Sequence, residues 1–191
     1  SRDAMNQVIQ EDLKQIKEEF AVSRRTVIED GKEAVYEEAP MEVQEVVFVM
    51  DRFGYCKLLD RQTYERNQET VDQEYKHRIP CLNTDKICIF TNTGSLHQVK
   101  VMEIPFGKLR DKGTPIDNVS KYDGSREEIV FLTCFGRLTG QMLLFATRMG
   151  MLKQVPAEEF ITNNRTVVAT KLQEGDQVAV IRVVGTETDL V

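Results

Sequence analysis

Basic side chains recur at one position of a repeated hairpin. The stretches 144–155 and 88–99 share Thr, a Gly three residues later, and then Leu, Gln and Val at identical offsets, and 47–59 is a weaker third copy. The position three residues after each hairpin Gly holds a basic or protonatable side chain: Lys57, His97 and Lys153. Such side chains bind phosphates by displacing counterions, with little base specificity. Solvated charges also keep edge strands from aggregating, so the pattern alone leaves both roles open.

Other cations lie close to these hairpins. The run 108–112 is the most basic short segment, with three cations in five residues beside a Gly-flanked loop. If the hairpins are arranged radially, their cations form a discontinuous stripe along a rim. The predicted phosphate-binding residues are Lys57, Arg61, His97, Lys100, Lys108, Arg110, Lys112, Arg148, Lys153 and Arg165.

Catalytic and metal-binding arrangements are not predicted. With two histidines, no Ser/His/Asp constellation can be argued, and no Gly-rich phosphate loop is present. His77, Cys81, Cys88 and His97 lack a Cys-x-x-Cys pair and have irregular spacings, so reduced and packed thiols are favoured over a zinc site. We therefore expect no catalytic residue, no metal site and no cofactor in this chain.

Strands must position the candidate residues. The hairpin glycines, Gly54, Gly94 and Gly150, are separated by 40 and 56 residues, which is typical of blade-like β repeats. The pattern predicts an all-β, propeller-like array of about three four-stranded blades, with units of about 45–85, 86–133 and 141–191. Residues 62–80 read as a long polar connection. A large apolar residue ten positions after each Gly is predicted to anchor the core: Tyr64, Ile104 and Phe160.

The N-terminal part differs from the repeats. Ile9, Leu13, Ile16 and Phe20 form one apolar stripe, which predicts an amphipathic helix over 4–20. We assign residues 1–28 to this helical part, 29–44 to an acidic linker or strap, and 45–191 to the repeats.

Composition narrows the class of protein. No apolar run reaches the roughly 18 residues of a membrane helix, no signal peptide is evident, and the four cysteines do not form a secreted disulfide pattern, so we expect a cytoplasmic protein. The net charge of −6 is uneven, because residues 1–42 carry six Lys/Arg and eleven Asp/Glu. The remaining 19 basic and 20 acidic residues leave 43–191 nearly neutral, which permits a local basic face.

Several segments resemble a known family. Residues 13–20 followed by Arg24-Arg25-Thr26-Val27-Ile28 resemble the helix end and Arg-Arg-Thr segment that join the core to the C-terminal domain in bacterial gyrase A and topoisomerase IV A subunits. Residues 45–49 with 53–57 resemble the first blade strand of that domain, and 166–176 are similar to its repeated strand and acidic turn. The resemblance covers nearly the whole chain.

The resemblance implies a β-pinwheel, a propeller-like ring whose basic rim binds and bends duplex DNA non-specifically to orient it for strand passage. The whole protein would be an ATP-dependent type IIA topoisomerase of the bacterial cytoplasm and nucleoid, using ATP and Mg²⁺ through other domains. Its partners would be double-stranded DNA, the ATPase subunit, which binds ATP, and the rest of its own polypeptide. The family's catalytic tyrosine lies in the breakage–reunion core. No tyrosine present here stands in that context: Tyr36, Tyr55, Tyr64, Tyr75 and Tyr122.

One segment departs from the family pattern. Gyrases carry a Gln-Arg-Arg-Gly-Gly-Lys-Gly box after the first hairpin, whereas residues 65–74 contain no Gly and several acids. The resemblance therefore fits a topoisomerase IV-like role better than gyrase-type wrapping. The alternative is a propeller-type protein-interaction scaffold with little DNA binding, which the near-neutral charge of 43–191 favours.

Overall fold

The computed structural model describes residues 2–22 and 42–185, which belong to two separate units. The first unit contains helix α1 (Arg2–Phe20), which confirms the helix predicted over 4–20. None of its residues is buried, so its apolar stripe is exposed. The Arg24-Arg25-Thr26 segment and most of the predicted linker lie outside the described residues. The second unit, called the β domain below, begins at Glu42.

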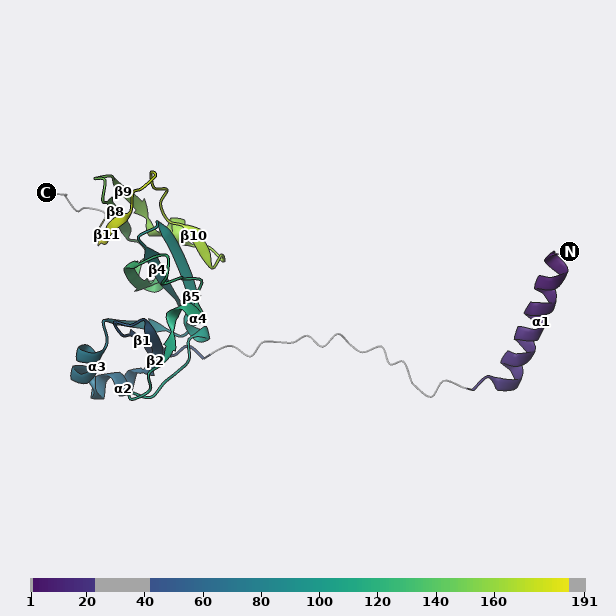
Figure 1. The fold of residues 1–191 in the computed structure, drawn as a ribbon. Helices are drawn as coiled ribbons and strands as arrows, with labels where there is room; N and C mark the ends of the chain where they lie inside the picture. Colours follow the sequence, from purple (N-terminus) through teal and green to yellow (C-terminus); the bar gives the residue numbers. More distant parts are fainter. Residues whose placement is uncertain (1, 23–41, 186–191) are drawn as a thin grey trace. The chain divides into compact units, whose positions relative to one another are not determined.

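The β domain is built from short strands joined by tight turns and small helices (Figure 1). Its strands are β1 (Glu45–Met50), β2 (Tyr55–Asp60), β3 (His77–Leu82), β4 (Lys86–Thr91), β5 (Ser95–Lys100), β6 (Thr114–Pro115), β7 (Ile129–Cys134), β8 (Met142–Thr147), β9 (Leu152–Pro156), β10 (Thr166–Val168) and β11 (Val178–Val184). Its helices are α2 (Arg61–Arg66), α3 (Gln68–Glu74) and α4 (Ile116–Val119), with 3-10 turns η1 (Val101–Glu103), η2 (Phe135–Arg137) and η3 (Ala157–Phe160). Across the described ranges, no helix is both long and apolar enough to span a bilayer.

The strands form three antiparallel sheets. Sheet 1 has the order β3-β1-β2-β6, sheet 2 the order β10-β5-β4-β7, and sheet 3 the order β11-β8-β9. The three predicted hairpins are the β1–β2, β4–β5 and β8–β9 pairs, each turning at a glycine with positive φ. In Figure 1, sheet 1 with α2 and α3 forms one end of the β domain, and β8, β9 and β11 form the other. The predicted blade-like, mostly β architecture is confirmed.

The sheets do not coincide with contiguous stretches of sequence. Strand β6 lies inside the predicted second unit, yet it pairs with β2 and completes sheet 1. Strand β10 lies inside the predicted third unit, yet it pairs with β5 and completes sheet 2. Each of these sheets therefore takes its fourth strand from the repeat that follows. The described part of sheet 3 has three strands, and its edge strands are β9 and β11.

Apolar side chains between the sheets form two main cores. One core joins sheets 1 and 2 around Phe48 and Ile89, and the other joins sheets 2 and 3 around Phe90 and Phe145. The rings of Phe90 and Phe145 meet edge to face with centroids 6.0 Å apart, a favourable aromatic geometry. Alternation along β4 explains the arrangement, because neighbouring residues point to opposite faces of a strand and both faces are covered.

Residues 62–80 are not a structureless connection, which corrects the sequence interpretation. Helix α2 begins after Asp60, whose side chain accepts a hydrogen bond from the Thr63 backbone N–H at 2.8 Å and caps the helix. Helix α3 follows, and the buried side chains of Val71 and Tyr75 cover the outer face of sheet 1. The apolar positions are few and are spread over two short helices, so the sequence shows no clear helical periodicity there.

The predicted core anchors occupy related but unequal environments. Ile104 belongs to the core between sheets 1 and 2, and Phe160 belongs to the core between sheets 2 and 3. The Phe160 ring meets the Phe90 ring edge to face, with centroids 5.5 Å apart. Tyr64 is only partly buried, because it lies on α2 against the small cluster outside sheet 1. Two of the three anchors are thus fully buried, and the third is partly so.

Candidate nucleic-acid interface

Lys57 is a buried structural residue, which corrects its assignment to a phosphate-binding rim. It lies on β2 and is 1% exposed. Its Nζ donates hydrogen bonds to three backbone carbonyls, those of Lys108 at 2.6 Å, Leu109 at 2.9 Å and Asp111 at 2.6 Å. A lysine ammonium has three N–H donors, and here all three are used. The buried Lys57 side chain therefore holds the backbone of the 108–112 run in place.

The 108–112 run forms a tight loop around this ammonium. Gly113 has φ +86°, and a Cβ there would lie 2.6 Å from the Cys56 carbonyl oxygen, so only glycine allows this approach. The loop exposes three cations: Lys108, Arg110 and Lys112. Carboxylates share the neighbouring hollow, where Asp51, Glu74 and Asp111 lie beside Arg110 and Lys112. The positive charge of the loop is therefore partly balanced by carboxylates that the fold places beside it.

His97 is also buried, which corrects its predicted surface role. It is 5% exposed, and its Nδ1 lies 3.0 Å from the Thr166 hydroxyl of β10. Its Nε2 lies 2.7 Å from Glu127 Oε1 and has no other partner within the described β domain. That contact is a hydrogen bond only when Nε2 carries a proton, which leaves Nδ1 to accept from Thr166 in the neutral ring. His97 therefore joins three chain segments.

The third equivalent residue, Lys153, is exposed on β9. Lys153 is exposed while Lys57 and His97 are buried because later segments of the chain cover the first two hairpins but not the third. The 107–113 segment covers Lys57, and β10 covers His97, whereas no strand of the described chain pairs with the outer edge of β9. One sequence position thus yields two buried residues and one surface cation. The predicted three-residue stripe is not formed.

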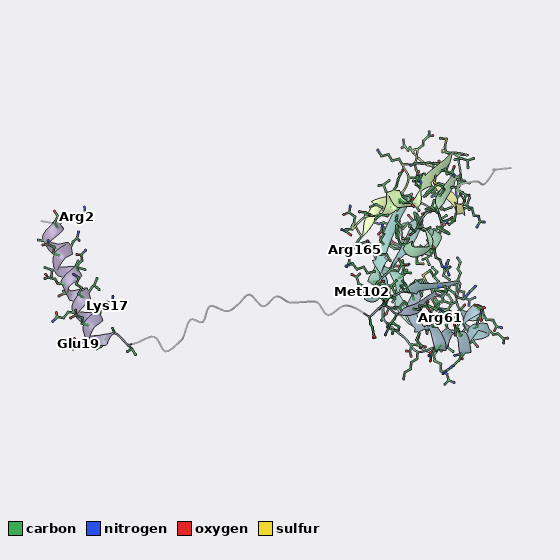
Figure 2. All side chains as sticks on the ribbon, turned by 180° about the vertical axis from the view of Figure 1, so that it is seen from behind. Arg2, Lys17, Glu19, Arg61, Met102 and Arg165 are labelled. Atoms are coloured by element: carbon green, nitrogen blue, oxygen red, sulfur yellow. The ribbon has the colours of Figure 1, made fainter. Side chains whose placement is uncertain are left out.

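The remaining predicted cations divide by their partners. Arg61 pairs with Glu45 and, at 2.8 Å, with Glu65, and Arg165 pairs with Glu103 at 2.9 Å. Within the described residues, the other exposed cations form no ion pair: Lys100, Lys108, Arg110, Lys112, Arg148 and Lys153. In Figure 2, Arg165 and Arg61 lie on different parts of the β domain. The ten predicted residues therefore do not form one continuous surface.

The structure does bring Lys100 and Arg165 together. They line a hollow of about 210 Å³ with Lys86, Gln98, Glu103, Asn163 and Asn164, and we call it the Lys86 hollow. Three cations and one carboxylate give its lining a surplus of two positive charges. Lys86 is directly opposite Lys100 in the β4–β5 register, and its Nζ donates to the Thr162 carbonyl at 2.8 Å. Lys86 was not among the predicted residues, although the hairpin register pairs it with Lys100.

The β domain belongs to the class of propeller-like domains built from blade sheets with exchanged strands. Its described fold resembles the solved C-terminal domain of a DNA topoisomerase IV, with a TM-score of 0.64 and 22% identity over 74% of this chain and 46% of that one. The C-terminal domain of E. coli ParC gives a TM-score of 0.57 and 15% identity over 74% of this chain and 57% of that one. Both similarities concern the fold.

The chain is similar in sequence to DNA gyrase A proteins. The DNA gyrase A protein of Lawsonia intracellularis is 29% identical over 187 residues, which cover 92% of this chain and 23% of the relative. The DNA gyrase A protein of Helicobacter pylori is 28% identical over 196 residues, covering 96% of this chain and 24% of the relative. No protein-family model matches. The chain is similar over nearly its whole length to DNA gyrase A proteins, has a fold like that of the topoisomerase IV C-terminal domain, and spans about a quarter of these relatives' length.

Proposed function

We propose that this chain binds duplex DNA through its phosphates and orients the bound segment for strand passage by a type IIA topoisomerase. The Lys86 hollow is the observation that carries the proposal, because Lys86, Lys100 and Arg165 converge there around a single carboxylate. Cations arranged in this way neutralise phosphates without reading base edges. The family relationship supports this use of the site.

We further propose a topoisomerase IV-like role rather than gyrase-type wrapping. Residues 65–74 form the end of α2 and helix α3, and they expose four carboxylates: Glu65, Glu69, Asp72 and Glu74. Carboxylates repel phosphates, so this edge of the β domain is unsuited to a wrapped duplex. DNA is expected to contact the Lys86 hollow and its surroundings only.

The whole protein's activity follows from the family relationship as a proposal. It would act as an ATP-dependent topoisomerase in the bacterial cytoplasm, in complex with a separate ATPase subunit. ATP and Mg²⁺ would be used by that partner and by other domains of the same polypeptide. The present chain would contribute DNA binding and no bond cleavage.

The test is a salt titration of DNA binding by the full 191-residue chain. Fluorescence anisotropy with a labelled duplex gives the affinity between about 50 and 200 mM salt. Each phosphate contact contributes about 0.9 to the slope of log K against log salt, so replacing Lys86, Lys100 and Arg165 by Gln should lower the slope by about 2.7. The loss should be equal for duplexes of different sequence.

A charge-matched variant controls for net charge. Lys76, Lys121 and Arg182 are exposed and do not line the Lys86 hollow, so their replacement by Gln should leave the slope nearly unchanged. Circular dichroism confirms folding of both variants. Absence of salt-sensitive binding by the unmodified chain near 50 mM salt would refute DNA binding, leaving the interaction-scaffold alternative. A larger effect from neutralising the 108–112 loop would move the principal contact there.

A further inference from the structure

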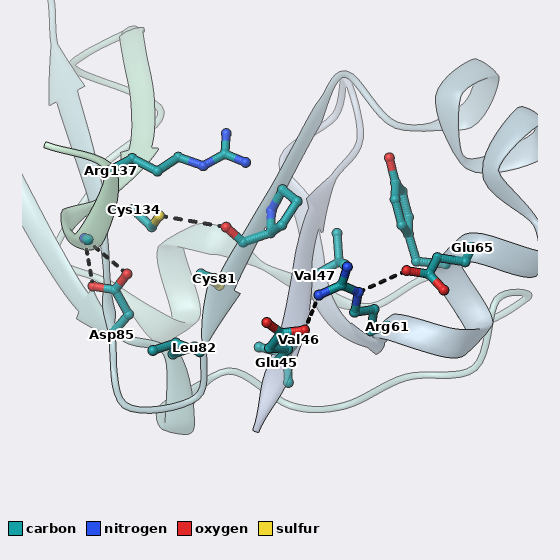
Figure 3. Close-up of a pocket in the computed structure, with 13 residues that line it drawn as sticks. Glu45, Val46, Val47, Arg61, Glu65, Cys81, Leu82, Asp85, Cys134 and Arg137 are labelled. Carbon is teal, nitrogen blue, oxygen red and sulfur yellow. Dashed lines mark hydrogen bonds and ion pairs between the residues drawn. The ribbon is translucent and has the colours of Figure 1, made fainter. Parts of the chain in front are cut away.

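A second surface feature lies away from the Lys86 hollow and shares no lining residue with it. It is a groove of about 420 Å³ that crosses β1 and β3 between α2 and η2 (Figure 3). We call it the Arg137 groove. Its volume lies within the usual range of ligand-binding clefts.

The η2 wall carries a cation, Arg137, on an anchored stretch of backbone. The Gly136 backbone N–H donates to both carboxylate oxygens of Asp85, at 3.1 and 3.0 Å, and the next residue but one, Leu138, is fully buried. A Cβ on Gly136 would lie 2.8 Å from Asp85 Oδ2, so a larger residue there would require the Asp85 carboxylate to shift. Arg137 is anchored between these two residues. In Figure 3 its guanidinium extends over the groove, and it forms no hydrogen bond or ion pair with side chains of the described chain.

The opposite wall carries more carboxylates than cations. Arg61 lies between Glu45 and Glu65 and pairs with both, which leaves this wall with a surplus of one negative charge (Figure 3). Tyr64, a residue of α2, also lines the groove and adds an aromatic ring with a hydroxyl group. At the η2 wall, Asp85 balances the charge of Arg137, but its carboxylate is bound to the Gly136 N–H and the Arg137 guanidinium stays available. The α2 wall has an excess carboxylate.

The floor between the walls is apolar. Leu82 is 41% exposed there, and Val47, Pro80 and Cys81 line the rest. Pro80 lies on β3, the end strand of sheet 1, and has no N–H, while its carbonyl accepts from the Cys134 thiol at 3.8 Å. A further β-strand could therefore not form backbone hydrogen bonds with Pro80, which has no N–H to donate and whose carbonyl is already used. An occupant is therefore held by its side chains.

We propose that the Arg137 groove binds an extended segment of a partner protein in which an apolar side chain stands between an acidic and a basic residue. The acidic side chain pairs with the Arg137 guanidinium, which suits bidentate recognition of a carboxylate. The apolar side chain covers Leu82, and the basic residue meets Glu45 or Glu65 at the α2 wall. This orientation follows from the available Arg137 guanidinium at one wall and the excess carboxylate at the other. It requires no DNA and is independent of the Lys86 hollow.

The test selects short, terminally blocked peptides from a random library on the immobilised full chain. Selected sequences should share an acidic residue and a basic residue on either side of an apolar one. Fluorescence polarisation with the best labelled peptide then measures affinity. Arg137→Gln should weaken binding about tenfold, because a charge-assisted pair is lost. Arg182→Gln, at an exposed arginine that does not line the groove, should leave affinity unchanged.

A charge exchange sharpens the test. Arg137→Glu should reject the selected peptide and accept the peptide whose acidic residue is replaced by Lys. The proposal is overturned if no shared pattern is selected, if Arg137→Gln leaves affinity unchanged, or if excess sodium acetate at constant ionic strength displaces the peptide, because acetate competition would indicate a simple carboxylate site. It is also overturned if Arg137→Gln weakens duplex DNA binding as much as peptide binding, since the groove would then be part of the DNA surface.

Discussion

Replacing Lys57 by Met tests whether a buried ammonium holds the 108–112 loop. Methionine keeps an unbranched chain of similar length, so packing under the loop is largely retained. Three hydrogen bonds from Nζ, at 2.6, 2.9 and 2.6 Å, are lost. Hydrogen bonds to charged groups contribute about 1.5–3 kcal/mol each, which totals roughly 5–9 kcal/mol. About half of this free energy is offset, because the variant no longer buries an ammonium group and water can hydrate the three carbonyls.

The net loss in free energy of unfolding should be roughly 2–4 kcal/mol. For a domain of this size that lowers Tm by about 5–15 °C. Urea unfolding followed by circular dichroism gives the first quantity, and a thermal melt gives the second. Lys153→Met is the matched control, because Lys153 has the same position in the third hairpin and is exposed. It should change stability by less than about 0.5 kcal/mol. Equal effects of the two substitutions would refute the structural role of Lys57.

Two further predictions concern a turn and a carboxylate. Gly94→Ala should lower the free energy of unfolding in urea more than Gly150→Ala does. Both glycines have φ near +80°, but a Cβ on Gly94 would lie 2.5 Å from the Thr170 carbonyl oxygen, whereas one on Gly150 would meet nothing within 4 Å. Equal losses in the two variants would contradict this account. The Thr147 hydrogen bond lowers the pKa of Asp176 below its usual 3.8, so its stabilising contribution should be complete above that pH and lost as pH falls below it. Asp176→Asn should flatten the acid side of the stability profile, and an unaltered profile would exclude this contribution.

Local patterns predicted the hairpins well because their determinants are local. A glycine with positive φ and flanking apolar residues fixes a hairpin regardless of the rest of the chain. The Gly94 hairpin formed where it was predicted, and the burial of Ile104 and Phe160 agrees with their spacing. The helices α2 and α3 were missed because α2 has no buried residue, and only Val71 and the following Tyr75 mark the buried side of α3.

The candidate site was predictable only in part because burial depends on distant segments. Lys57 and Lys153 have the same local pattern, and only the loop at 107–113 distinguishes them. His97 is covered by Thr166, which is 69 residues away in sequence. Lys100 and Arg165 were predicted separately, but their convergence with Lys86 depends on the tertiary fold. Sequence patterns identified cations, and the fold decides which of them reach solvent.

The exchange of β6 and β10 between repeats makes the sheets mechanically interdependent. In a solenoid, each repeat contacts only its neighbours and can fray from one end. Here, detaching the segment that contains β10 also strips β5 of its outer partner and uncovers His97. Proteolytic cleavage between two sequence repeats therefore damages two sheets at once. This strand exchange favours unfolding of the whole β domain in one cooperative transition. It also means that a single sequence repeat cannot be excised without exposing a strand edge.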